Sequence, residues 1–212
     1  MSVPVAVKNI VRDVLGECLE AGIVRPADVR GIVAVRLGEA AVAHRDYVER
    51  RVAAYAAYAG VLTLSVEERN AVDAAMAAVG CADTLAILDA AQGAIGGARA
   101  DAISRAFDTA LADLDIAVDP VMARAEAFTL ILDITRMSAD EDAAVTDALI
   151  AVLGESRAVL RQACREALGA RFAEITNALR DGARVFPRVA FRDPIADRIQ
   201  AAMALAAYEE RA

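Results

Sequence analysis

The chain has 212 residues, enough for one domain or at most two small ones. It carries a formal net charge of −8, and 58% of its residues are hydrophobic, with alanine making up about a quarter of the chain. Three cysteines are too few for a disulfide scaffold, and the low proline and glycine content excludes a collagen-like or Pro/Gly-rich disordered chain. The composition is typical of a soluble, globular helical protein and by itself indicates no activity.

The sequence as given is expected to carry neither a signal peptide nor a membrane span. No basic region precedes an apolar stretch near residue 1, so no secretory signal peptide is expected. The longest run without a charge covers residues 52–66, which is shorter than the roughly 20 apolar residues of a membrane span. Cys18, Cys81 and Cys164 are odd in number and far apart, a pattern typical of a reducing compartment. We therefore expect a cytoplasmic chain without a membrane span.

In chain order, start and stop signals predict eight or nine helices and no strand. A first helix is expected over about residues 5–21, where Gly22 ends it, and Pro26 opens the second. Further glycines stand where left-handed helix ends or a break are expected: Gly80, Gly154, Gly182 and the pair Gly96-Gly97. Only residues 183–193, ARVFPRVAFRD, are expected to form an extended loop.

Two kinds of N-terminal cap recur along the chain. The capping box, a serine followed three residues later by a glutamate, is matched by Ser65 with Glu68 and by Ser138 with Glu141. Asp119 and Asp193 each precede a proline, which predicts an aspartate cap with proline at the first helical position. Helices are therefore expected to begin at or near Ser65, Asp119, Ser138 and Asp193.

The helix from Ser138 shows the spacing of an amphipathic helix. Apolar residues three and four apart predict one buried face, made by Ala144, Val145, Ala148, Leu149, Val152 and Leu153. The opposite face is expected to meet water through Asp140, Asp142 and Asp147.

An internal repeat is the most informative pattern. Asp46, Asp119 and Asp193 lie 73 and 74 residues apart, and each begins the pattern D-x-[V/I]-x-x-R-x-x-A. Ser65 and Ser138 follow the first two aspartates at one common distance. Residues 86–107 also align with 158–179, with four identities other than alanine: Leu88/Leu160, Gly97/Gly169, Arg99/Arg171 and Ile103/Ile175.

The expected fold is a single all-α domain, residues 1–212, built as a compact multi-helix bundle or a short α-solenoid. It would contain about three degenerate repeats of roughly 73 residues, over residues 1–80, 81–154 and 155–212. The last copy would reach Ala212 without its Ser-capped helix. An arginine stands five residues after each aspartate. In one interpretation it pairs with a carboxylate of the neighbouring unit or lies in water. In the other, the three arginines make equivalent contacts to a ligand.

Residues that could perform chemistry form no complete motif. His44 is the only histidine, so neither a catalytic triad nor a zinc site is expected, and we expect it at a helix end or on the surface. Asp113, Asp115 and Asp119 could hold a hard cation but lack the EF-hand order. Arg99, after the glycines of GAIGGAR, could bind an anion at a helix N-terminus, although a helix break explains the glycines better. No cofactor and no metal are expected.

The uneven charge supplies the best hint of function. Residues 101–147 contain eleven acidic residues and three arginines, whereas residues 157–192 contain eight arginines and three acidic residues. The arginine-rich end is expected to bind a partner through Arg180, Arg184, Phe186, Arg188, Phe191 and Arg192. Basic and aromatic residues of this kind also bind single-stranded nucleic acid, but the net charge of −8 would repel its phosphates. The alternative is that both phenylalanines pack onto the helices.

The sequence therefore predicts a non-catalytic scaffold, assembly subunit or adaptor, which binds a protein partner or further copies of itself. A helical module that binds a small apolar ligand is the alternative. An enzyme or a nucleic-acid-binding protein fits the residues less well.

Overall fold

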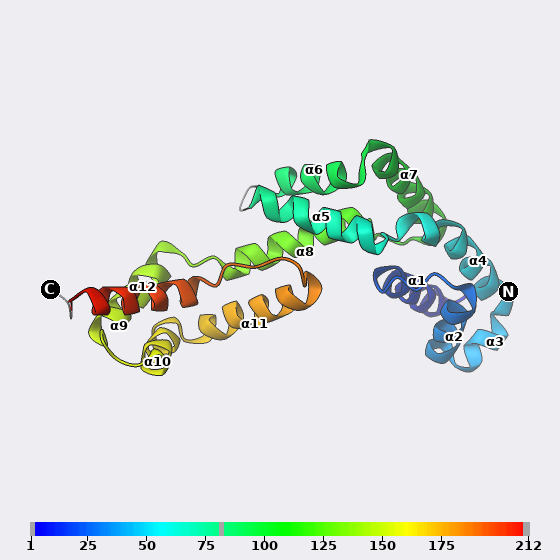
Figure 1. Ribbon diagram of the computed structural model, residues 1–212. Coiled ribbons are helices and arrows are strands. Elements are labelled where there is room, and N and C mark those ends of the chain that lie inside the picture. Colours follow the sequence, from blue (N-terminus) through cyan, green and yellow to red (C-terminus); the bar gives the residue numbers. More distant parts are fainter. Residues whose placement is uncertain (1–2, 81–82, 210–212) are drawn as a thin grey trace. The chain divides into compact units, whose positions relative to one another are not determined.

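The computed structural model describes residues 3–80 and 83–209, and in this part of the chain all regular secondary structure is helical (Figure 1). It contains twelve helices and no strand, so the all-α prediction is confirmed. The expected number of eight or nine was too low, partly because Gly38 and Gly169, both at φ 55°, divide predicted helices. Among the described residues, no helix has both the length and the apolar content needed to cross a membrane.

The chain divides into two compact units, residues 1–126 and 127–212. The first contains α1 (Val5–Glu20), α2 (Pro26–Leu37), α3 (Glu39–Ala43), α4 (Arg45–Leu62), α5 (Val66–Val79), α6 (Thr84–Ile95) and α7 (Gly97–Leu114). The division falls inside α8 (Pro120–Thr135), and the second unit continues with α9 (Ala139–Ala151), α10 (Arg157–Leu168), α11 (Ala170–Val185) and α12 (Pro194–Glu209). The three-repeat division, with limits near residues 80 and 154, stays a prediction.

In the first unit, α1, α2 and α4 pack together, α5 packs against α6, and α4 packs against α7 (Figure 1). Val11, Val14 and Leu15 of α1 are fully buried, as are Val29 and Val33 of α2. These residues recur every three or four positions, so each helix turns one apolar stripe inward.

In the second unit, α10 packs against α9, α11 and α12. The core between these helices contains Val145, Leu149, Leu160, Cys164, Leu168, Phe172, Ile175, Ile195 and Ile199. The amphipathic prediction for α9 is confirmed for Val145 and Leu149, but Ala144 is exposed and Asp142 is only half-exposed. An alanine stripe is a weak predictor of burial, because alanine has little surface to gain from it.

All four predicted helix starts are confirmed. Ser65 accepts from the N–H of Glu68 at 3.1 Å, and Ser138 accepts from the N–H of Glu141 at 3.2 Å; both capping boxes are complete. Asp119 accepts from the first N–H groups of α8, and Asp193 does the same for α12.

Two predictions about the end of α11 were wrong. Gly182 does not end a helix; it lies inside α11, where a Cβ would come within 3.0 Å of the Phe191 ring and 3.1 Å of Ile131. The helix also continues to Val185, so the extended loop begins at Phe186 rather than at residue 183. The glycine is therefore needed for close packing rather than for a turn. Gly22, Gly80 and Gly154 do have positive φ, as predicted.

Candidate functional site

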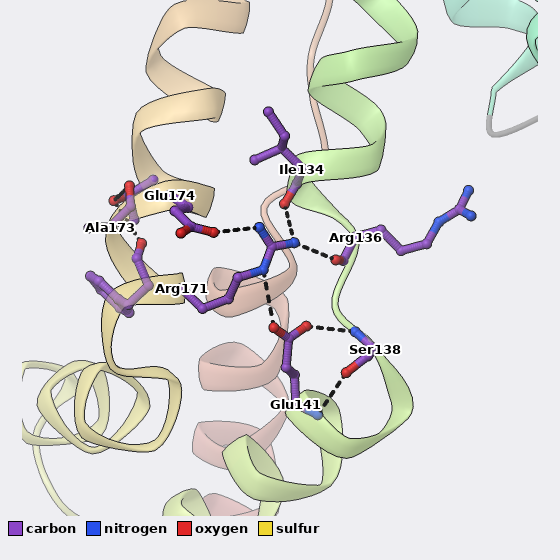
Figure 2. A network of polar contacts seen from close by, with 9 residues as sticks. Ile134, Arg136, Ser138, Glu141, Arg171, Ala173 and Glu174 are labelled. Carbon is purple, nitrogen blue, oxygen red and sulfur yellow. Dashed lines mark hydrogen bonds and ion pairs between the residues drawn. The ribbon is translucent and has the colours of Figure 1, made fainter.

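Arg171, in the first turn of α11, joins three segments of the second unit (Figure 2). Its Nε donates to Glu141 at 3.1 Å, and its Nη2 donates to the carbonyl oxygens of Ile134 at 2.7 Å and Arg136 at 3.2 Å. Its Nη1 donates to Glu174. Because Glu141 also closes the capping box of α9, the guanidinium connects the end of α8 to the beginning of α9. We call this set of contacts an arginine clamp.

Arg99 makes matching contacts to a glutamate and two carbonyl oxygens in the first unit. Its Nε donates to Glu68 at 2.6 Å, while Nη1 and Nη2 donate to the carbonyl oxygens of Val61 at 2.8 Å and Thr63 at 3.2 Å. Each partner lies 73 residues before its counterpart in the Arg171 clamp: Val61/Ile134, Thr63/Arg136, Ser65/Ser138 and Glu68/Glu141. The two arginines lie 72 residues apart.

The clamps satisfy backbone carbonyls that a helix C-terminus leaves without a partner inside the helix. The arginine side chains are 27% exposed for Arg99 and 26% for Arg171, so both ion pairs are partly shielded from water. The Arg99 guanidinium lowers the pKa of Glu68. Anion binding by Arg99, considered from the sequence, is therefore not favoured, because all three of its nitrogens donate to groups of its own unit.

The arginines that follow the repeated aspartates divide into two groups. Arg124 binds Asp73, a carboxylate that is 3% exposed, and Arg198 binds Asp142. Both arginines thus form ion pairs, whereas the assignment of their partners to a neighbouring repeat stays a prediction. Arg51 differs, because it lies over the ring of Tyr47 in its own helix and donates to the tyrosine hydroxyl.

The arginine-rich segment after α11 is anchored by aromatic packing. Phe186 is fully buried, and its ring lies 5.4 Å from Phe128 and 5.9 Å from Phe191, both centroid to centroid. This burial favours the alternative interpretation, in which the Phe186 ring packs onto the helices instead of binding a partner. Phe191 is half-buried in the same cluster.

The four arginines in the last turns of α11 and in the segment after it lie on the surface. Arg180, Arg184, Arg188 and Arg192 are all exposed, and the side chains of Arg184 and Arg192 are 81% and 85% exposed. Local acids contact two of them: Asp181 lies 3.8 Å from Arg184, and Asp197 lies 2.5 Å from Arg192. The structure thus places these four arginines on the surface and the Phe186 ring in the interior.

The carboxylates considered as a cation site have separate partners. Asp113 accepts from the Tyr58 hydroxyl at 2.7 Å, Asp115 pairs with Arg12, and Asp119 caps α8. Within residues 3–80 and 83–209 no group of three or more His, Cys, Asp or Glu side chains could hold a metal ion.

The remaining candidate residues have structural positions. His44 is half-buried between α3 and α4. Cys18 and Cys164 are buried free thiols, and burial raises the pKa of each. Cys81 lies outside the described residues.

Sequence reasoning missed two exposed apolar areas. Val35 on α2 and Val42 on α3 are 83% and 81% exposed, the highest values for large apolar side chains in the described part of the chain. On α12, Met203, Leu205 and Tyr208 are 39%, 46% and 73% exposed. The uncharged run from residue 199 to 208 was the available signal, but helical spacing alone does not show whether a neighbour covers it.

No protein-family model, curated protein or solved structure matches the chain.

Proposed function

We propose that this chain is a non-catalytic helical scaffold or adaptor that acts through protein–protein contacts in the cytoplasm. Its helices would form about three degenerate repeats of roughly 73 residues within one domain. The arginine-rich surface at the end of α11, formed by Arg180, Arg184, Arg188 and Arg192, would bind an acidic surface of a partner protein. The buried thiols of Cys18 and Cys164 support a reducing compartment.

Duplication of the arginine clamp supports the repeat. Alanine identities carry little weight in a chain so rich in alanine, but the clamp depends on one arginine, one capping box and two carbonyl oxygens at matched spacing. The ion pairs of Arg124 and Arg198 add a second matched feature, since each reaches the preceding Ser-capped helix.

The anchored arginine surface is the observation that carries the proposed function. Phe186 holds the segment against α8, so the arginines are displayed on a defined backbone rather than on a free tail. A pre-ordered segment loses less conformational entropy on binding. Arginine is also enriched at protein interfaces, where its planar guanidinium binds carboxylates in a bidentate way.

Site-specific photo-crosslinking in the cells that make the protein tests this proposal. A photoreactive residue replaces exposed Arg188 in one variant and exposed Arg69 of α5 in a matched control. Defined protein adducts are expected at position 188, few at position 69, and loss of the adducts when Arg180→Glu and Arg184→Glu are added. Equal labelling at both positions, or adducts that survive the charge reversal, would contradict the proposal.

Native mass spectrometry of the purified chain addresses the small-ligand alternative. The scaffold proposal expects the 22.2 kDa chain or whole multiples of it. A stoichiometric extra mass of a few hundred daltons would instead favour an apolar ligand held between helices.

A further inference from the structure

Two arginines of α10 lie over one aromatic ring at the beginning of α11, a helix that packs against α10 (Figure 1). The guanidinium carbon of Arg161 is 5.1 Å from the centroid of the Phe172 ring, and that of Arg165 is 5.2 Å from it. The ring is buried, whereas both arginines are exposed. Cation–π attraction to the ring therefore holds two positive charges near one another at the surface of the second unit.

The positive charge of this pair is not neutralised inside the chain. Arg161 and Arg165 are one helical turn apart, and like charges at this spacing repel. Within the described part of the chain, no carboxylate forms an ion pair with either arginine. The acidic residues nearest in sequence bind other groups: Glu166 accepts from a glutamine of its own helix, and Glu174 accepts from Arg171. A bound anion with two negative charges would relieve the repulsion.

The stacked pair has no counterpart in the first unit. In the register that aligns Arg99 with Arg171, 72 residues apart, the two arginines and the ring correspond to an aspartate, a glycine and an alanine: Asp89, Gly93 and Ala100. The arginine clamp and the capping box occur in both units. The pair and its ring are therefore not required by the contacts that the two units share.

A phosphate monoester has the charge and the geometry that this pair lacks. It carries about −1.5 to −2 charges near pH 7 and has three acceptor oxygens. Two guanidinium groups can each donate two hydrogen bonds to it, whereas a carboxylate is satisfied by one guanidinium. The net charge of −8 opposes nucleic acid and anionic membranes, which present many negative charges together, but it opposes a single phosphate group far less.

We propose that Arg161 and Arg165, positioned by the Phe172 ring, bind the phosphate group of a phosphorylated side chain on a partner protein. The inference rests on the proposed adaptor function and makes one of its contacts depend on phosphorylation. At an exposed site, the polypeptide that carries the phosphate adds contacts of its own, which a free phosphate ion does not. Stacking on the ring restricts both guanidinium groups before the partner arrives, so less conformational entropy is lost on binding.

Immobilised peptide libraries test this inference on the full-length chain. Each library consists of short peptides with random flanking residues and carries phosphoserine, phosphotyrosine, glutamate or serine at its centre. At least one phosphorylated library is expected to retain the chain about tenfold or more tightly than the glutamate library, and the serine library to retain none. Inorganic phosphate is expected to displace the chain only in large excess over the peptide. Equal retention by glutamate and phosphorylated peptides, or displacement by equimolar inorganic phosphate, would overturn the inference.

Two double variants with the same loss of charge show whether the α10 pair is responsible. Arg161→Gln with Arg165→Gln is expected to weaken retention by the phosphorylated library about tenfold or more. Arg69→Gln with Arg105→Gln, at exposed positions of α5 and α7, is the matched control and is expected to keep wild-type retention. Equal losses in the two double variants would show a general effect of charge and overturn the assigned site.

Substitutions of the ring test its positioning role. Phe172→Leu keeps an apolar side chain but removes the aromatic face, so retention is expected to weaken several-fold at unchanged helix content, measured by circular dichroism. Phe172→Tyr keeps the aromatic face and is expected to keep retention. Equal retention by Phe172→Leu and the wild type would refute the role of the ring.

The photo-crosslinking experiment at position 188 does not involve α10, so the two proposals fail separately. Adducts at position 188 without phosphorylation-dependent retention would overturn this inference alone. Retention of the phosphorylated library without adducts at position 188 would overturn the proposed role of the arginines at the end of α11 and leave the α10 site standing.

Discussion

Arg99 and Arg171 show how one side chain can join a helix end to the next helix start. Each guanidinium reaches two carbonyl oxygens and the glutamate of a capping box, while about a quarter of the side chain stays in contact with water. Hydrogen bonds that involve a charged group contribute more than neutral ones, and partial burial limits screening by salt.

Removal of one clamp should lower stability measurably. Arg171→Ala is expected to reduce the free energy of unfolding by about 1–3 kcal/mol, because a half-buried glutamate and two carbonyl oxygens lose their donor. The free energy of unfolding of Arg171→Lys should lie between those of Arg171→Ala and the wild type, because an ammonium group keeps the charge but cannot reproduce the planar guanidinium. Urea unfolding measures the change. Exposed Arg180→Ala is the control and should stay within about 0.5 kcal/mol of wild type; equal losses for both would contradict a specific role for the clamp.

Glu68 should make stability depend on pH. Arg99 lowers its pKa in the folded state, so folding favours the ionised form. The stabilisation is present above the unfolded pKa, about 4.3 for glutamate, and is lost as the pH falls through the lower folded pKa. Glu68→Gln removes this titration. The stability gap between wild type and Glu68→Gln, measured in urea at neutral pH and near pH 3, is expected to narrow at the acidic value; a constant gap would refute the coupling.

At the scale of the helix, α11 is shaped by one glycine and the rings around it. Gly182 lies in the helix interior, where alanine would normally be preferred by about 1 kcal/mol. The Phe191 ring and Ile131 occupy the space that a Cβ would need. Phe128, Phe186 and Phe191 then fix the segment after α11 at the surface of the second unit.

Two glycine-to-alanine substitutions should therefore have opposite signs. Gly182→Ala is expected to destabilise by about 1–3 kcal/mol through overpacking against Phe191. Gly16→Ala lies inside α1, where an added Cβ would meet no atom within 4 Å, and is expected to stabilise by about 0.5–1 kcal/mol. Thermal and urea unfolding give both values. Stabilisation by both substitutions would show that the contact around Gly182 relaxes freely.

At the scale of the whole molecule, each clamp belongs to one compact unit. The Arg99 contacts lie within residues 1–126, and the Arg171 contacts lie within residues 127–212. Because α8 runs through the limit between the units, the chain could unfold as one cooperative body or in two steps.

Hydrogen exchange followed by mass spectrometry distinguishes these two behaviours. Arg171→Ala is expected to lower amide protection mainly in residues 127–212, and Arg99→Ala mainly in residues 1–126, because local opening needs only the contacts of its own unit to break. Each variant serves as the control for the other. Uniform loss of protection along the chain in both variants would show instead that the two units unfold together.

The sequence by itself determined the four capped helix starts and the helix ends at Gly22 and Gly80. A cap at Ser65 or Ser138 depends on a glutamate three residues away, and the left-handed glycines depend on a single backbone angle, so both are readable from neighbouring residues. The spacing of Arg99 and Arg171 was also visible, although the carbonyl oxygens that they bind were not. Those acceptors lie more than thirty residues before each arginine and carry no side-chain signature.

Only the tertiary structure decided which apolar groups are covered. Phe186 and Tyr208 are both large aromatic residues near charges, yet one is fully buried and the other is 73% exposed. Local pattern cannot separate them, because burial depends on what a distant segment places against the side chain: Phe128 meets Phe186, whereas the face of α12 around Tyr208 stays open to water. Gly182 gives a second example. The Phe191 ring that packs against it, and not a turn, requires a residue without a side chain at this position.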